Sequence, residues 1–198
     1  MDEDNPILRD RLGRPYHKHK YADGKPNREL THEEFSHVMT NSKIPSRYKA
    51  YIVMLYWIGC RRSEPMAIMK EDIEEKEGCL MIDIPAFKRG MRGGLISLPL
   101  NYYGVQWIKE AWERARDKHR VFKFTDRTGY NYVKQLFPKM TPHWFRHNRI
   151  TQLRKKIDGK TISLDDVKSF TGIKSDRTIQ HYGMRTQEGI DRVVKVLM

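Results

Sequence analysis

Residues 51–64 read YIVMLYWIGCRRSE, and this stretch decides the fold that the sequence predicts. The apolar residues up to Ile58 would cover every side of a helix, whereas a surface helix has a single apolar face. We therefore expect a buried central helix that follows Pro45. Gly59 suits the end of that helix because glycine adopts the left-handed conformation without a steric cost. The polar residues after it then form a turn into a short helix over 65–69.

Helical patterns flank this central helix on both sides. Thr31 followed by Glu34 is a capping box, which predicts the start of a first helix just after residue 30. Further helices are predicted over 105–115, 131–137, a segment that begins at Thr141 and Pro142, 167–170, a segment that carries Tyr182, and 187–196.

Strand patterns are confined to one region after the central helix. Residues 79–84 and 95–98 have strand character, and a weaker edge strand is expected at 72–75. The intervening residues 88–94 form a basic, glycine-rich hairpin loop. The sequence thus predicts a mainly α fold with a small three-stranded antiparallel β-sheet, an α+β domain.

The composition favours a polyanionic partner. The 198 residues carry a net charge of +13, so nucleic acid is the first candidate and an acidic membrane surface the second. Cys60 and Cys79 cannot form the disulfide framework of a secreted domain, and neither belongs to a CxxC pair. The longest apolar run is too short to span a bilayer. We expect a soluble protein of a reducing compartment, the cytoplasm or nucleoid.

The chain divides into an arm and a domain. Residues 1–28 contain seven arginines and lysines without a helical or strand period, and residues 29–198 carry the predicted elements. The arm is either a disordered end, a linker from an upstream domain, or a basic strap along a DNA backbone.

Five residues form a candidate phosphodiester site. Arg61 and Arg146 offer forked guanidinium donors that can clamp both non-bridging oxygens of a phosphate in the transition state. His143 lies three residues before Arg146, hence on the same helix face, and would donate to the same phosphate. Lys88 either protonates a leaving oxygen or only contacts a phosphate. Tyr182 would attack, and a phosphotyrosyl bond is easily reversed.

A metal site is not expected at the paired histidines. His143 and His147 are four residues apart, but the HExxH glutamate and a third ligand are missing, and Arg146 would place positive charge beside a cation. We interpret His147 as a buried structural histidine.

These residues resemble, in their order along the chain, the catalytic domain of tyrosine recombinases, the phage-type integrases. The resemblance runs from about Leu30 to the C-terminus. Residues 59–65 are similar to the G-x-R-x-S-E box, and residues 86–99 are similar to the hairpin with the catalytic lysine. Residues 143–147 are similar to the H-x-x-R-H box, and residues 178–182 are similar to the segment that ends in the nucleophile. The resemblance implies that Arg61, Lys88, His143, Arg146 and Tyr182 are catalytic, that Glu64 and His147 support them, and that Arg62, Arg89 and Arg92 contact DNA.

One position departs from the family pattern. The family places a histidine, or sometimes a tryptophan, nine residues before the tyrosine, where this chain has Ile173. Isoleucine cannot donate a hydrogen bond to a phosphate, so the reaction is slower or the neighbouring Lys174 substitutes. The upstream core-binding domain of the family is also missing, which makes the chain a fragment or a minimal member.

The resemblance implies a site-specific recombinase or integrase of a virus or mobile element. It would cut and rejoin double-stranded DNA through a 3′-phosphotyrosyl intermediate, as a dimer to tetramer on DNA, without a metal, cofactor or small-molecule substrate. It would act at the nucleoid or in the host cell of that element. The alternatives are a type IB topoisomerase-like nicking and resealing enzyme, a catalytically weak or inactive DNA-binding module of the same fold, and a generic basic nucleic-acid binder. The target site, the direction of reaction and delivery of Tyr182 in cis or in trans stay open.

Overall fold

The computed structural model describes residues 8–9, 15–16, 29–85, 94–159, 161–173, 176 and 179. Contacts divide the chain into one unit of Met1–Glu29 with Arg185–Met198 and another of Leu30–Met184. In the first unit, strands β1 (Leu8–Arg9) and β2 (Pro15–Tyr16) pair antiparallel, which the sequence did not predict. The predicted boundary between residues 28 and 29 stays a prediction. All elements described below belong to the second unit.

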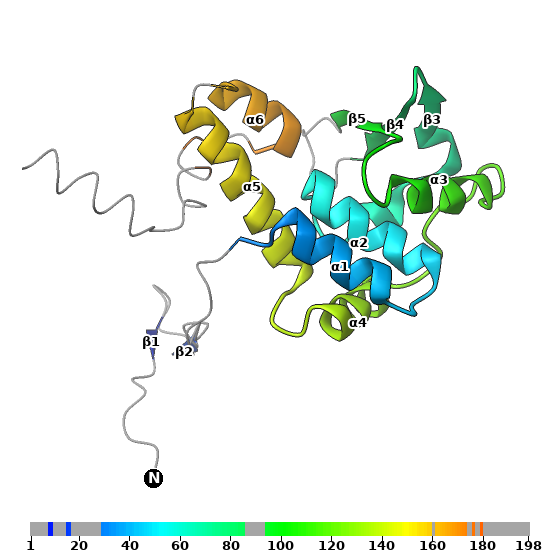
Figure 1. Ribbon diagram of the computed structural model, residues 1–198, viewed down its shortest axis with the longest axis horizontal. Helices are drawn as coiled ribbons and strands as arrows, with labels where there is room; N and C mark the ends of the chain where they lie inside the picture. The colour runs from blue at the N-terminus through cyan, green and yellow to red at the C-terminus, as the bar shows by residue number, and fades with distance from the viewer. Residues whose placement is uncertain are drawn as a thin grey trace, which may run out of the picture. The chain divides into compact units, whose positions relative to one another are not determined.

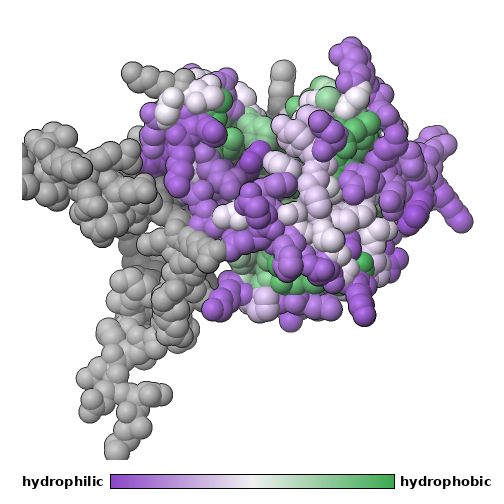
Figure 2. All heavy atoms as spheres, in the orientation of Figure 1, coloured by the Kyte–Doolittle hydropathy of each residue, from purple (hydrophilic) through white to green (hydrophobic). Residues whose placement is uncertain are grey.

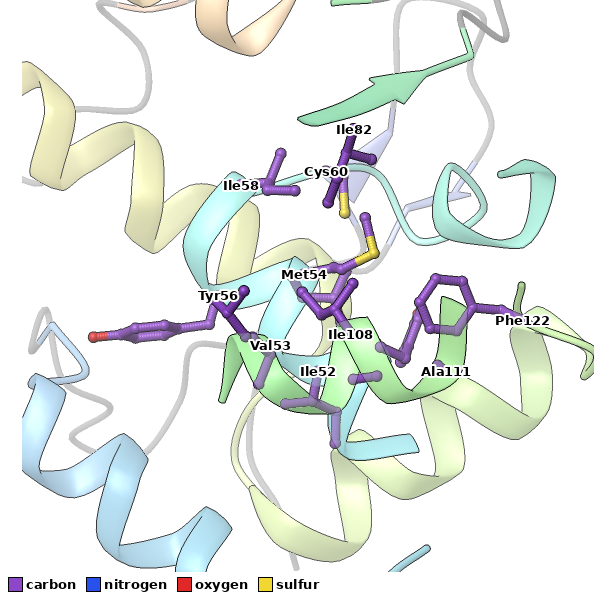
Figure 3. Packing of buried hydrophobic residues seen from close by; sticks show 14 of the residues in the cluster. Ile52, Val53, Met54, Tyr56, Ile58, Cys60, Ile82, Ile108, Ala111 and Phe122 are labelled. Carbon is purple, nitrogen blue, oxygen red and sulfur yellow. The ribbon is translucent and has the colours of Figure 1, made fainter. Parts of the chain in front are cut away.

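The predicted central helix is confirmed as α2 (Ser46–Ile58). Every residue from Ala50 to Tyr56 is buried, because other elements cover α2 on all sides. Figure 3 shows apolar side chains of α2 packed near Ile108 and Ala111, which come from α3 (Val105–Glu113). Burial of such side chains is the main source of stability for a domain of this size.

Two further helices pack against α2 (Figure 1). The predicted capping box at Thr31 is present and begins α1 (His32–Asn41). The fully buried ring of Phe35 on α1 stacks on Tyr56 at a centroid distance of 3.8 Å. Helix α4 (Asp126–Leu136) contacts α2 along the side that carries Tyr51.

Helix α4 begins five residues earlier than predicted, at 126 instead of 131. The Thr125 hydroxyl accepts a hydrogen bond from the Thr128 N–H and caps the helix at this earlier position. Gly129 lies inside the helix because a Cβ there would stand 2.8 Å from the ring of Tyr51. The close approach of α4 to α2 therefore requires a glycine at this position.

The predicted sheet is confirmed, with strands β3 (Ile73–Lys76), β4 (Cys79–Ile84) and β5 (Gly94–Pro99) in antiparallel order β3-β4-β5. Alternate residues of β4 are buried, as a sheet with one covered face requires. Ile84 pairs with Gly94 at the end of the β4–β5 ladder. Short 3₁₀ helices η1 (Pro65–Ala67) and η2 (Lys70–Asp72) precede the sheet, so the helix expected over 65–69 is shorter than predicted.

The C-terminal part of the described chain consists of α5 (Pro142–Asp158) and α6 (Leu164–Thr171). Helix α5 has Thr141 as its N-cap, as predicted, and helix α6 begins three residues before the predicted residue 167. The expected helices that carry Tyr182 and cover 187–196 lie outside the described residues, apart from Asp176 and Ile179. For the described residues, a mainly α fold with a three-stranded antiparallel sheet is confirmed.

The face drawn in Figure 2 is mostly hydrophilic, with small and separate apolar patches, as expected for a chain with 32% charged residues. Within the described part of the chain, no helix is long and apolar enough to cross a membrane.

Candidate active site

Arg61 is fixed by the turn that follows α2. The carboxylate of Glu64 accepts hydrogen bonds from the Arg61 backbone N–H at 2.5 Å and from the Arg61 guanidinium Nη1 at 2.6 Å. The Glu64 side chain is 8% exposed and the Arg61 side chain 35% exposed. One buried carboxylate therefore sets both the turn and the direction of the guanidinium, which still reaches solvent. The expected supporting role of Glu64 has a geometric basis in these two contacts.

Arg146 is buried and held by two backbone carbonyls. Its Nη1 donates to Gly59 O and its Nη2 donates to Thr171 O, both at 2.8 Å. Gly59 is the C-cap of α2, and Thr171 is the last residue of α6. A guanidinium group has five N–H donors, so these two contacts orient it without using its full capacity.

The two arginines therefore meet at one turn. Arg146 is 87 residues from Gly59 in sequence, yet it binds the carbonyl that lies two residues before Arg61. Gly59 has φ +68°, and a Cβ there would lie 2.9 Å from the Arg149 Cβ on α5. The glycine thus serves both as the end of α2 and as the point of closest approach to α5.

The two histidines of α5 differ in environment. His143 lies in the first turn of α5 and is exposed, whereas His147, one turn later, is half-buried. Burial lowers the pKa of His147, and the charge of His143 lowers it further. His147 is therefore neutral at pH 7. The sequence predicted it as a buried residue, and its burial is partial.

Arg62 forms an ion pair with Asp126, the first residue of α4, at 2.7 Å. Both side chains are well exposed, at 51% and 39%. The carboxylate competes with the DNA contact expected for Arg62, so that contact would require the exposed pair to open.

Several residues of the expected site lie outside the described residues: Lys88, Arg89, Arg92, Lys174 and Tyr182. The base of the hairpin that carries the first three is described, because Ile84 pairs with Gly94. A Cβ on Gly94 would lie 3.8 Å from Ser169 O of α6. The hairpin base thus lies beside the helix whose last carbonyl holds Arg146.

Ile173 points its side chain into an apolar cluster. It is 7% exposed and packs with Ile150, Val167 and Ile179, which are at most 1% exposed. Its backbone N–H donates to Thr171 Oγ1 at 3.4 Å. The position where the resemblance leads one to expect a phosphate donor is therefore occupied by a buried packing residue.

Three contributors to the site were not found from the sequence. Thr171 acts through its backbone carbonyl, for which the side chain gives no signal. Asn148 is buried on α5, and its Oδ1 accepts from Leu30 N–H at 3.1 Å. Arg149 lies over the rings of Trp57 and Phe170, and burial lowers its pKa. The only signal in the sequence for Asn148 and Arg149 was that two polar residues directly follow the H-x-x-R-H box.

Among the described residues, no group of three or more His, Cys, Asp or Glu side chains is arranged to hold a metal ion. Arg61 and Arg146 bring two guanidinium groups to the turn after α2, and His143 adds an exposed imidazole on α5. Such groups stabilise negative charge and donate hydrogen bonds to phosphate oxygens.

Solved structures with similar folds include recombinases and an integrase. The chain is similar to the XerH site-specific recombinase bound to difH substrate in a pre-cleavage complex (18% identity, TM-score 0.64, covering 96% of this chain and 60% of that chain). It is also similar to XerA recombinase (16%, 0.62, 84% and 64%) and to a lambda integrase dimer bound to a COC′ core site (16%, 0.56, 81% and 48%). The chain thus spans about three fifths of the XerH chain. At these identities the likeness shows the fold.

Sequence comparison identifies the family. Comparison with curated proteins gave no match. The sequence model of the phage integrase family matches residues 28–188, which covers most of the chain and all four segments of the resemblance. The chain therefore belongs to the phage integrase family.

Proposed function

We propose that this chain binds duplex DNA and cuts and rejoins its strands through a covalent 3′-phosphotyrosyl intermediate. The observation that carries the proposal is the convergence of Arg61 and Arg146 on the turn after α2, one held by Glu64 and the other by two backbone carbonyls. Two forked cations at fixed positions suit a phosphodiester, on which charge builds as the pentacovalent state forms.

The proposed steps use residues of this chain alone. The Tyr182 phenol oxygen attacks the phosphorus while its proton leaves to solvent with the help of His143. The bond to the 5′ oxygen breaks, and Lys88 supplies the proton to that leaving oxygen. Arg61, Arg146 and His143 stabilise the charge on the non-bridging oxygens. The 5′-hydroxyl of another strand then attacks the phosphorus of this bond and gives its proton back to Lys88. The bond to Tyr182 breaks, and the phenol oxygen takes a proton from solvent with the help of His143. No cofactor is required, because the phosphotyrosyl bond conserves the energy of the phosphodiester bond.

Duplex DNA is the proposed partner. The net charge of +13 supports a polyanion, and XerH and lambda integrase were solved bound to DNA, the latter as a dimer. Arg62, Arg89 and Arg92 are the proposed backbone contacts, and assembly on DNA as a dimer or tetramer is part of the proposal. Phosphate contacts release counterions, so affinity falls steeply with salt. The place of action is the cytoplasm, at the nucleoid or in the host cell of a virus or mobile element.

The test is trapping of the covalent adduct. A pool of end-labelled, nicked duplexes with randomised sequence removes the need to know the target site. The expected result is an SDS-resistant adduct that disappears in Tyr182→Phe. The matched control is Tyr102→Phe, which removes the same hydroxyl from an exposed tyrosine. An adduct that survives Tyr182→Phe would remove Tyr182 as the nucleophile.

The second candidate is a catalytically weak or inactive DNA-binding module of the same fold, which the apolar burial of Ile173 favours. A gel shift that shows duplex binding, without a covalent adduct on any nicked substrate, would support this module. A type IB topoisomerase-like enzyme would instead form the adduct and relax supercoiled plasmid without exchanging strands between duplexes.

A further inference from the structure

A second apolar cluster, separate from the main core, lies at the C-terminal end of the described chain. Its buried members are Ile150 of α5, Val167 of α6, and Ile173 and Ile179 beyond α6. Half-buried apolar residues such as Ile157 and Leu164 pack against them. Two of the four buried members follow α6 in sequence, and the burial of their side chains places Ile173 and Ile179 in one cluster with residues of α5 and α6.

The same segment connects an arginine anchor with the expected nucleophile. Thr171 O accepts the hydrogen bond of Arg146, and Thr171 Oγ1 donates to Val167 O at 2.7 Å. Two residues after Thr171, the side chain of Ile173 enters the cluster, and Ile179 lies three residues before Tyr182. The cluster therefore contains the buried contacts nearest in sequence to Tyr182 within the described part of the chain.

The environment of Ile173 excludes an easy exchange for a hydrogen-bond donor. The side chain is 7% exposed and its cluster partners are isoleucine and valine. A polar ring placed among these apolar side chains would lose its contacts with water, which is unfavourable. Packing is thus the role that the surroundings of this residue support.

We propose that Ile173 is a positioning residue, which, together with Ile179, fixes the segment leading to Tyr182 relative to the anchor of Arg146. The proposal rests on the proposed function, because it assigns Tyr182 as the group to be placed. At this position, where the resemblance implies a histidine or tryptophan, the described contacts are apolar packing contacts. Misplacement of a reacting group by about 1 Å costs on the order of a hundredfold in rate.

The test compares deletions of one side chain from two places in the cluster. Ile173→Ala removes the proposed anchor, and Ile157→Ala removes the same atoms from α5, which does not lead into the Tyr182 segment. Adduct formation on the nicked duplex pool is expected to slow by on the order of tenfold to a hundredfold in Ile173→Ala, with duplex affinity unchanged. Ile157→Ala is expected to react within about threefold of the parent rate, because it leaves that segment in place. Equal slowing in both variants would overturn the proposal.

Conservative and polar replacements of Ile173 distinguish a role in apolar packing from a role in hydrogen-bond donation. Ile173→Leu keeps the apolar volume and is expected to retain most of the rate, whereas Ile173→His is expected to be as slow as Ile173→Ala. A rate in Ile173→His equal to or above that of the unmodified chain would show that a donor is what the position needs, and would overturn the proposal.

Hydrogen exchange tests the anchor without any chemistry. Peptides that cover 174–182 are expected to exchange faster in Ile173→Ala than in Ile157→Ala, in the absence of DNA. Equal exchange in the two variants would overturn the proposal even if the unmodified chain forms the adduct. Faster exchange in Ile173→Ala would support it even if no adduct forms, in which case the proposed function fails by itself.

Discussion

Substitution of Gly59 by alanine tests the closest contact between α2 and α5. Gly59 has φ +68°, and the added Cβ would lie 2.9 Å from Arg149 Cβ and 3.1 Å from Arg149 Cγ. The left-handed conformation costs an alanine about 1–2 kcal/mol. Crowding at a packed contact costs about 1–3 kcal/mol more. We therefore expect Gly59→Ala to lower the free energy of unfolding by about 2–5 kcal/mol.

Gly78 supplies the matched control. It has φ +75° in the turn between β3 and β4, and a Cβ there would meet nothing within 4 Å. Gly78→Ala therefore carries the conformational cost alone, about 1–2 kcal/mol. Both substitutions restrict the unfolded chain equally, so this contribution cancels in the comparison. The difference between the two variants isolates the crowding against α5.

Urea unfolding followed by circular dichroism measures both free energies, with unchanged slopes as the check that the transition stays two-state. The reasoning would be refuted if the two variants lost the same free energy of unfolding to within about 0.5 kcal/mol, because crowding at a packed contact is expected to cost more than that. Helices α2 and α5 would then move apart at little cost in free energy, and the Gly59 carbonyl would not be a rigid anchor for Arg146. A larger loss in Gly59→Ala, accompanied by slower adduct formation, is the expected outcome.

Three further predictions concern charged groups around the site. Glu64→Gln weakens the grip on Arg61 and should slow adduct formation by about ten- to a hundredfold, in single-turnover assays. Asp126→Asn releases the exposed Arg62, so duplex affinity at low salt should rise. The free energy of unfolding should change by less than about 1 kcal/mol, and a larger decrease would contradict the assignment of a surface ion pair. Because burial lowers the folded-state pKa of His147, stability should be complete above the unfolded value of about 6.5 and decline as pH falls below it; His147→Gln should flatten this slope in urea titrations between pH 5 and 8.

The elements of the fold were largely predictable because local signals and burial agree. The run after Pro45 is apolar all round, and α2 is buried from Ala50 to Tyr56. Capping residues such as Thr31 and Thr141 marked helix starts that the structure has at the same positions. The start of α4 was missed because Gly129 signals a turn locally, while its actual reason is the ring of Tyr51 on another helix. A contact between distant residues cannot be inferred from one segment.

The sequence offered residue types for the candidate site, but little about their surroundings. The partnership of Glu64 with Arg61 follows from their spacing in one turn. The ion pair of Arg62 with Asp126 joins residues that only the fold brings together. The burial of Ile173 could not be deduced either, because its cluster partners come from three different segments.

The two arginines of the site differ in charge balance, and this difference suggests how they divide the work. Arg61 is paired with a carboxylate, so part of its charge is already compensated in the free protein. Arg146 is 4% exposed, and the two partners described above are neutral carbonyls, which orient the guanidinium but leave it cationic. Among the described residues, no carboxylate forms an ion pair with Arg146; a buried cation without a counter-charge is costly, and an incoming phosphate would compensate it. We therefore propose that phosphate binding improves the electrostatic environment of Arg146 more than that of Arg61, and that Arg61 contributes mainly direction.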